Sequence, residues 1–179
     1  MSEKIRFATI WLDGCSGCHM SFLDIDDRLL TLADKVDVVF SPLVDTKHFP
    51  ENVDITLVEG ALGSEEDLHK IQLIRKNTRV LVSFGDCAVT ANISSVRNPF
   101  GREETLKSIY LDKEALGNTR IPDEVVPALL PAALPLHHVV KVDVFIQGCP
   151  PSADTIFFAI SELVEGRTPD LTALTRFGA

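Results

Sequence analysis

Positive charge is scarce in this chain of 179 residues. Lys and Arg together number 17 and Asp and Glu number 26, so the formal net charge is −9 at pH 7. Proteins that bind nucleic acid normally present a basic face, and the anionic surface of a membrane attracts basic segments rather than acidic ones. We therefore expect neither nucleic acid nor a membrane surface among the partners of this protein.

Long apolar runs are also missing. The longest apolar stretch, residues 125–136, is interrupted by prolines at 127, 131 and 135, whereas a membrane-spanning helix needs about 20 consecutive apolar residues. The start, Met-Ser-Glu-Lys, lacks the charged segment, apolar run and small-residue cleavage site of a secretory signal peptide. We therefore expect a soluble, cytoplasmic protein without a membrane span.

The sequence contains no internal repeat and no low-complexity tail. Hydrophobic residues make up 45% of the chain and charged residues 24%, which is typical of globular proteins rather than disordered ones. A chain of 179 residues has the size of one ordinary domain and can build a core without disulfide bonds. We therefore predict a single domain over residues 1–179.

Strand-like and helix-like segments alternate along the chain. Apolar, β-branched segments predict five strands, over residues 5–12, 36–40, 54–58, 80–84 and 139–146. Apolar spacing and capping residues predict helices over residues 19–33, 64–77 and 153–165. Ser64 is the expected N-cap of the second helix, with Asp67 completing a capping box, and Gly166 is placed to end the third. This alternation predicts an α/β fold with a doubly wound parallel sheet.

The stretch 89–141 interrupts this alternation. It holds a candidate short helix near residues 103–116 and the proline-spaced apolar segment described above. Proline at that spacing excludes a regular helix or a central strand. The segment either packs on its own domain or marks a partner interface, since exposed apolar surface of this kind often does.

Cysteine is rare, but its four positions share one feature. Cys15, Cys18, Cys87 and Cys149 all follow predicted strands, in turns that contain glycine. In open parallel sheets, ligands bind at the edge formed by the carboxyl ends of the strands. Four thiols delivered to that edge can converge, and glycine leaves room for a bulky inorganic group near the backbone. In a reducing compartment such cysteines suggest metal binding or redox chemistry rather than structural disulfides.

The residues alone leave four interpretations of these cysteines open. A [4Fe–4S] cluster needs four thiolates, which matches the count. A structural zinc site also takes four cysteines, but it usually uses two close pairs, and only Cys15 and Cys18 form one. A thiol–disulfide oxidoreductase would explain that Cys-x-x-Cys pair and would leave Cys87 and Cys149 without a role. Unrelated buried cysteines are the fourth interpretation.

Three motifs taken together resemble a known family. Residues 11–18 (Trp-Leu-Asp-Gly-Cys-Ser-Gly-Cys), 85–88 (Gly-Asp-Cys-Ala) and 148–151 (Gly-Cys-Pro-Pro) resemble the small, electron-transferring subunit of nickel–iron hydrogenases. The resemblance covers about residues 5–165, and within the family it points to the cytoplasmic NAD-reducing, or bidirectional, branch. The quinone-facing cluster subunit of respiratory complex I shares the last two motifs but typically carries two adjacent cysteines in the first. That subunit is one alternative function, and a stand-alone thiol–disulfide oxidoreductase is the other.

The resemblance implies a flavodoxin-like fold with one [4Fe–4S] cluster at the carboxyl edge of the strands. It implies Cys15, Cys18, Cys87 and Cys149 as the cluster ligands and no catalytic residue in this chain. It also implies a large subunit that carries the nickel–iron (NiFe) centre and oxidises hydrogen. The cluster would relay electrons to a ferredoxin-like subunit of a diaphorase module that holds FMN and reduces NAD. We do not expect FMN in this chain, because the loop 13–18 offers only one hydroxyl, that of Ser16.

Four further residues are expected near the cluster or at a subunit interface: Asp13, His19, Glu59 and Asp86. Members of the family often have an acidic residue directly before the first cysteine, whereas Gly14 stands there in this chain and Asp13 lies one position earlier. Glu59 ends a predicted strand on the cysteine edge. His19 is not needed as an iron ligand, because four cysteines complete the set. Asp86 is expected mainly to cap the short helix that follows it.

Overall fold

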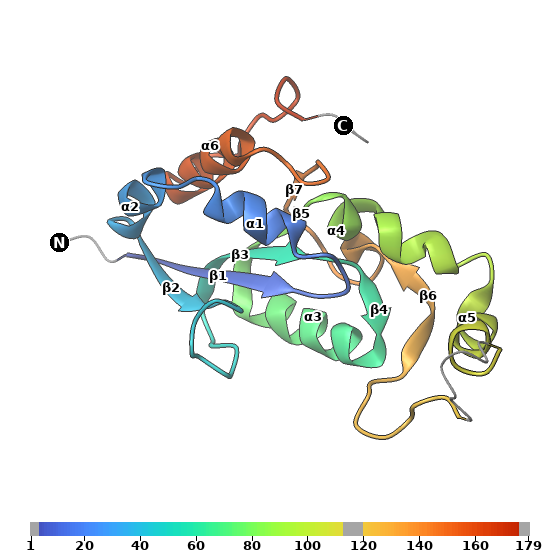
Figure 1. Ribbon diagram of the computed structural model, residues 1–179. Coiled ribbons are helices and arrows are strands. Elements are labelled where there is room, and N and C mark those ends of the chain that lie inside the picture. Colours follow the sequence, from blue (N-terminus) through green and yellow to red (C-terminus); the bar gives the residue numbers. More distant parts are fainter. Residues whose placement is uncertain (1–3, 113–119, 176–179) are drawn as a thin grey trace.

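Five parallel strands form the central sheet (Figure 1). The structure is a computed structural model that describes residues 4–112 and 120–175. The sheet strands are β1 (Ile5–Trp11), β2 (Val36–Phe40), β3 (Val53–Glu59), β5 (Thr78–Phe84) and β7 (Val144–Ile146). They lie in the order β2-β1-β3-β5-β7. Numbered in chain order within this sheet, that is the 2-1-3-4-5 order of flavodoxin-like folds, so the predicted fold class is confirmed.

Helices cover both faces of the sheet. One face packs against α1 (Gly17–Leu23), α2 (Arg28–Ala33) and α6 (Ala153–Val164), and α3 (Glu65–Asn77) covers the other (Figure 1). On β3, Ile55 and Leu57 join the core under α6, while Val58 joins the core under α3. Since both faces are covered, successive residues of the strand are buried, and the sequence is nearly continuously apolar.

A smaller two-stranded sheet lies beside the central one. Its antiparallel strands are β4 (Leu62–Ser64) and β6 (Leu129–Leu134), and the chain between α3 and β6 also forms α4 (Asp86–Thr90), η1 (Asn92–Arg97) and α5 (Gly101–Tyr110). The proline-spaced segment is thus neither a regular helix nor a central strand, as predicted. Leu130 of β6 is buried in the core under α3, so this strand packs on its own domain, while Val125 ahead of it is fully exposed.

Two predicted elements differ from the structure. The predicted helix 19–33 is split into α1 and α2, because Asp26 between them adopts a left-handed conformation with a φ of 59°. The predicted strand 139–146 shrinks to β7, because its first residues form the turn after the short helix η3 (Leu136–His138), where the N–H groups of Val139 and Val140 donate to the Leu136 carbonyl. The candidate helix 103–116 is α5, which begins at Gly101, and residues 113–116 lie outside the described part of the chain.

Serine caps begin both α3 and α6, and the first of them, Ser64, is the predicted one. Ser64 accepts a hydrogen bond from the Asp67 N–H, and the Asp67 side chain accepts one from the Ser64 N–H, so the capping box is complete. Ser152 caps α6 in the same way, through the Thr155 N–H. These caps fix where α3 and α6 leave the carboxyl edge of the sheet.

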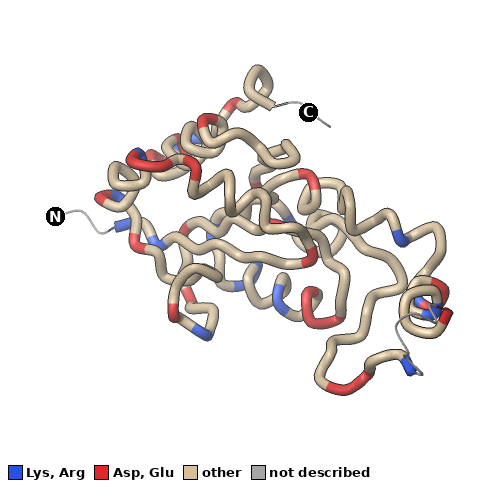
Figure 2. Tube along the Cα trace, in the orientation of Figure 1, with Lys and Arg blue, Asp and Glu red and all other residues tan. Residues whose placement is uncertain are grey.

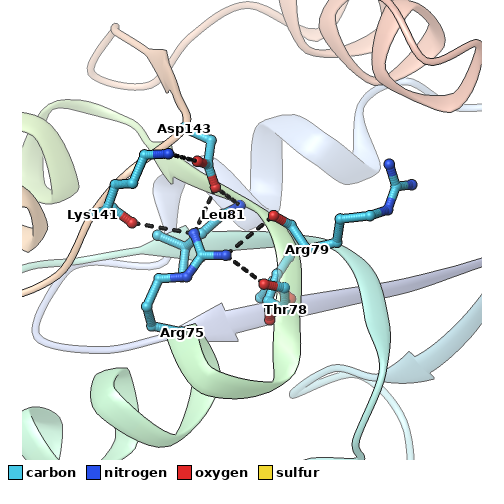
Figure 3. Close-up of polar contacts among 7 residues, drawn as sticks. Arg75, Thr78, Arg79, Leu81, Lys141 and Asp143 are labelled. Atoms are coloured by element: carbon cyan, nitrogen blue, oxygen red, sulfur yellow. Dashed lines mark hydrogen bonds and ion pairs between the residues drawn. The ribbon is translucent and has the colours of Figure 1, made fainter.

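A polar network ties the strands together at the opposite, amino-terminal edge (Figure 3). The Arg75 side chain at the end of α3 donates to the carbonyls of Thr78 and Lys141 and, at 2.6 Å, to the Asp143 carboxylate. Asp143 also accepts the Leu81 N–H at 2.9 Å. Burial alone would raise the pKa of Asp143, but these hydrogen bonds and the Arg75 charge lower it below its usual value. The network anchors β7 beside β5.

Candidate metal centre

The four cysteines lie at the carboxyl edge of the sheet. Cys15 is in the loop after β1, Cys18 in the first turn of α1, Cys87 in the first turn of α4 after β5, and Cys149 in the turn after β7. All four are free thiols. Cys18 and Cys87 are buried, at 7% exposed each, whereas Cys15 and Cys149 reach the surface. The predicted placement of these residues at strand ends is therefore correct.

The Cys18 thiol lies where the three turns meet. A Cβ atom at Gly85 would be 2.1 Å from the Cys18 Sγ and 3.5 Å from the Gly148 carbonyl oxygen, which precedes Cys149. Burial raises the pKa of the Cys18 thiol well above its usual range, and the nearby Glu59 carboxylate raises it further. Within residues 4–112 and 120–175, no three His, Cys, Asp or Glu side chains gather as ligands of a single metal ion. In a four-iron cluster, by contrast, each of the four thiolates binds a different iron.

Gly85 provides space beside Cys18. A Cβ atom at Gly85 would lie 2.1 Å from the Cys18 Sγ, and the residue has a φ of 82°, which side chains rarely adopt. Only glycine therefore lets the turn between β5 and α4 approach this sulfur so closely. Gly85 thus makes room for the Cys18 sulfur itself, and room for an inorganic group beside these glycines stays a prediction.

Lysine and arginine are absent from the loops that carry the cysteines. Residues 12–22, 85–96 and 147–152 contain neither, and Figure 2 shows the edge as mostly uncharged with a few acidic positions. The charge of four thiolates would therefore be balanced by a bound cationic group and by hydrogen-bond donors rather than by basic side chains.

Glu59 is buried directly behind Cys18. The residue ends β3 and is 1% exposed, and its carboxylate accepts the N–H of Cys18 at 3.3 Å and that of His19 at 2.9 Å. The same carboxylate contacts the His19 Nδ1. His19 is itself 5% exposed, and its Nε2 has no hydrogen-bond partner among the described residues. Glu59 and His19 therefore form a buried pair that braces the first turn of α1, a link that the sequence did not reveal.

Asp86 joins two of the cysteine turns, and its predicted role as a helix cap is wrong. The N-cap of α4 is Gly85, and the Asp86 carboxylate accepts the Gly148 N–H at 2.8 Å. The Asp86 N–H in turn donates to the Gly148 carbonyl at 2.9 Å. Asp86 thus fixes the turn before Cys149 against the turn that carries Cys87.

Asp13 contacts the second sheet and η1. Its backbone pairs with Ala61, and its carboxylate fills the space over Gly63, where a Cβ atom would be 2.1 Å from Oδ2. Burial and the charge of Asp67 raise the pKa of Asp13, while Arg97 opposes this shift. The residue lines a cavity of about 680 Å³ beside η1 and α5.

The sequence did not reveal one residue beside the cysteines, Asn92. Its side chain donates a hydrogen bond to the Cys149 Sγ at 3.4 Å. No sequence pattern indicates this contact, because Asn92 and Cys149 are 57 residues apart and meet only when β5 and β7 pair.

Comparison with known proteins identifies the family. A family model described as NADH ubiquinone oxidoreductase, 20 Kd subunit, matches residues 15–163, a range that includes all four cysteines. The chain belongs to this family. It is thus an oxidoreductase subunit, and its relatives show which branch it resembles.

Curated relatives include hydrogenase subunits. The NAD-reducing hydrogenase HoxS subunit delta of Cupriavidus necator is 41% identical over 94% of this chain and 82% of its own length. One subunit of the F420-non-reducing hydrogenase vhu is 36% identical in Methanocaldococcus jannaschii and 37% identical in Methanococcus voltae, over 93% and 96% of this chain. The chain spans only 58% and 60% of those two proteins.

Solved structures agree with the sequence comparison. One chain in a crystal structure of NAD⁺-reducing [NiFe]-hydrogenase in the H2-reduced state aligns with a TM-score of 0.93 and 39% identity. The alignment covers 98% of this chain and 99% of that one. A [NiFeSe]-hydrogenase chain from Dm. baculatum aligns at a TM-score of 0.57 and 18% identity, over 94% of this chain and 67% of that one, which shows a shared fold alone. The resemblance to the small subunit of NAD-reducing hydrogenases is confirmed.

Proposed function

We propose that this chain is the small subunit of a soluble, cytoplasmic NAD-reducing nickel–iron hydrogenase and that it holds one [4Fe–4S] cluster through Cys15, Cys18, Cys87 and Cys149. The observation that carries the proposal is the set of four free thiols at one sheet edge, where Gly85 beside Cys87 approaches both the Cys18 sulfur and the Gly148 carbonyl before Cys149. They occur in a chain that is 41% identical to a hydrogenase subunit. The complex would catalyse H2 + NAD⁺ → NADH + H⁺.

The residues at this edge fit such a cluster. The four thiols supply the four ligands that it requires. Gly85 leaves space next to the Cys18 sulfur, Asp86 holds the turn before Cys149 against the turn that carries Cys87, and Glu59 holds the segment of Cys18 against the end of β3. When bound, the cluster would supply one-electron transfer between neighbouring subunits. The polypeptide fixes its position and the hydrogen bonds around it, in a single flavodoxin-like domain.

Partner subunits complete the proposal. A large subunit would carry the NiFe centre, and a ferredoxin-like subunit would accept electrons for a diaphorase module with FMN and NAD. Large apolar side chains are exposed around the cysteine edge, among them Trp11 at 49%, Met20 at 61% and Ile93 at 61%. Apolar groups concentrated on one face commonly mark an interface with another chain.

The alternatives differ in what they require of the cysteines. A stand-alone thiol–disulfide oxidoreductase needs only Cys15 and Cys18, so Cys87→Ser and Cys149→Ser would leave it active. A cluster needs all four thiolates, so each single change to serine lowers the iron content. A quinone-facing complex I-like subunit would also hold a cluster but would not co-purify with nickel.

The decisive experiment is anaerobic purification of the complex that contains this chain, followed by iron, sulfide, nickel and zinc analysis. We expect nickel on a larger partner in the wild-type complex. Compared with wild type, the Cys87→Ser and Cys149→Ser complexes should each contain about four fewer iron atoms and four fewer sulfide ions. Iron without nickel would favour the complex I-like alternative. Zinc, or no metal together with an oxidisable Cys15–Cys18 pair, would contradict the proposal.

A further inference from the structure

One tight turn directs a hydrogen-bond donor at the sulfur of Cys149. The C-cap of α4 is Ala91, which has a φ of 62° and donates its N–H to the Cys87 carbonyl at 2.9 Å. The chain then turns into η1, whose first residue, Asn92, donates its side-chain amide to the Cys149 Sγ at 3.4 Å.

The conformation of this turn is held by its surroundings. A left-handed φ is uncommon for a residue with a side chain and persists where neighbouring structure supports it. Ala91 is 1% exposed and packs in a small core with Ala61 and Ala133. The turn is thus fixed from the side of the second sheet, so the backbone that carries the Asn92 side chain is held in place.

Hydrogen bonds to the ligand sulfurs of an iron–sulfur cluster change its reduction potential, because they interact with the negative charge of the cluster. A hydrogen bond to a ligand sulfur stabilises the more negative, reduced state more than the oxidised state, so it raises the reduction potential. The loops at this edge contain no Lys or Arg that could have the same effect. Asn92 is therefore placed to act on the potential through a side chain that can be changed by mutation.

We infer that Asn92 is a positioning residue that raises the reduction potential of the cluster through its hydrogen bond to Cys149. This inference rests on the proposed function, because it requires a cluster bound by Cys149. It goes further by assigning a role to a residue that is not a ligand. A purely local role, in which the Asn92 side chain only favours the turn, would change stability and leave the potential where it is.

The test uses the purified complex and an EPR-monitored redox titration. The signal that Cys149→Ser alters is assigned to the cluster of this chain. Asn92→Leu removes the donor at unchanged charge, and Asn92→Asp removes it at nearly unchanged size and adds a negative charge. The matched control is Asn98→Leu, because Asn98 follows η1 and bonds the Ala133 backbone through both side-chain atoms.

We expect Asn92→Leu to keep its iron and sulfide and to shift the reduction equilibrium up to about tenfold toward the oxidised state, which equals 59 mV for one electron. Asn92→Asp should shift it further in the same direction, and Asn98→Leu should leave it unchanged. Wild-type potentials in both Asn92 variants would overturn the inference while the proposed function stands. A wild-type complex without iron and sulfide on this chain would instead refute the proposed function itself.

Discussion

The carboxylate of Glu59 holds the first turn of α1 by accepting the backbone N–H of His19 at 2.9 Å while it also contacts the ring of that residue. Both residues are buried, so these hydrogen bonds are shielded from solvent. The same carboxylate accepts the N–H of Cys18, which connects a proposed cluster ligand to the end of β3.

The first prediction follows from these hydrogen bonds to the Glu59 carboxylate. Glu59→Ala leaves two backbone donors buried without acceptors, and each costs about 1–3 kcal/mol. We expect a clearly lower melting temperature and a lower iron content in Glu59→Ala, whereas Glu59→Gln, which keeps one acceptor oxygen, should lose less of both. Thermal unfolding and iron analysis measure the two effects.

Glu66→Ala is the control for that experiment. Glu66 forms an exposed ion pair with Lys70 on α3, and such pairs contribute about 0.2–1 kcal/mol. If Glu59→Ala were as stable and as rich in iron as Glu66→Ala, the role of Glu59 in holding the first turn of α1 would be refuted.

The gathering of the cysteines at one sheet edge could be predicted from the sequence, because it depends on local patterns. Each cysteine follows an apolar strand by a few residues, and parallel strands place their carboxyl ends together. The contacts between the turns were not predictable in this way. Asp86 meets Gly148 across 62 residues, and Asn92 meets Cys149 across 57, so both depend on the pairing of β5 with β7. Asp86 was assigned to the nearest helix because a cap is the contact that neighbouring residues suggest.

Gly85→Ala is the second prediction. The added methyl group would lie 2.1 Å from the Cys18 Sγ, and the residue would also have to keep a φ of 82°. We expect a loss of stability of several kcal/mol, since overpacking alone typically costs about 1–3 kcal/mol and the backbone strain adds to it. Loss of the cluster should accompany it, because Cys18 must move. Chemical unfolding and iron analysis of the variant complex are the measurements.

Gly101→Ala separates the cost of overpacking from the cost of backbone strain. Gly101 has a nearly equal φ of 75°, but a Cβ atom there would meet no other atom within 4 Å. This control should therefore lose about 1 kcal/mol from backbone strain and retain its iron. Equal stability and equal iron content in the two variants would show that Gly85 is not needed for space beside Cys18.

The third prediction concerns pH and the Arg75–Asp143 network (Figure 3). The pKa of Asp143 is lowered in the folded chain, so its ionised form contributes stability at neutral pH. That contribution is present above the unfolded pKa of 3.8 and is lost as the pH falls through the lower, folded value. Asp143→Asn should therefore be less stable than wild type by about 1–3 kcal/mol at pH 7, and the difference should shrink as the pH falls below about 4.

Urea unfolding at several pH values tests this expectation. Glu165→Gln serves as the control, because Glu165 forms an exposed ion pair with Lys35 and its removal should change stability by less than about 0.5 kcal/mol. A difference between wild type and Asp143→Asn that stays constant from pH 7 to pH 3 would contradict the assigned role of the carboxylate.

The last prediction concerns the partner subunit. Val96 and Phe100, at the end of η1 and before α5, are 62% and 66% exposed and line the cavity of about 680 Å³ beside Asp13. If the larger subunit covers this face together with the cysteine edge, a carboxylate here would be desolvated on assembly without a partner, which costs several kcal/mol. We therefore expect Val96→Asp and Phe100→Asp to reduce co-purification of the nickel-containing subunit at least tenfold.

Leu30→Asp is the matched control for these interface variants. Leu30 is 73% exposed on α2, which lies at the end of the molecule away from the second sheet (Figure 1). The interface variants and the control each put one carboxylate at an exposed apolar position. They therefore differ mainly in where on the surface that carboxylate lies. Thermal unfolding of each chain establishes that it is folded, and nickel in the purified complex reports assembly. Equal nickel recovery from Phe100→Asp and Leu30→Asp would show that the partner docks elsewhere, and loss of nickel in both would indicate a general effect of added negative charge.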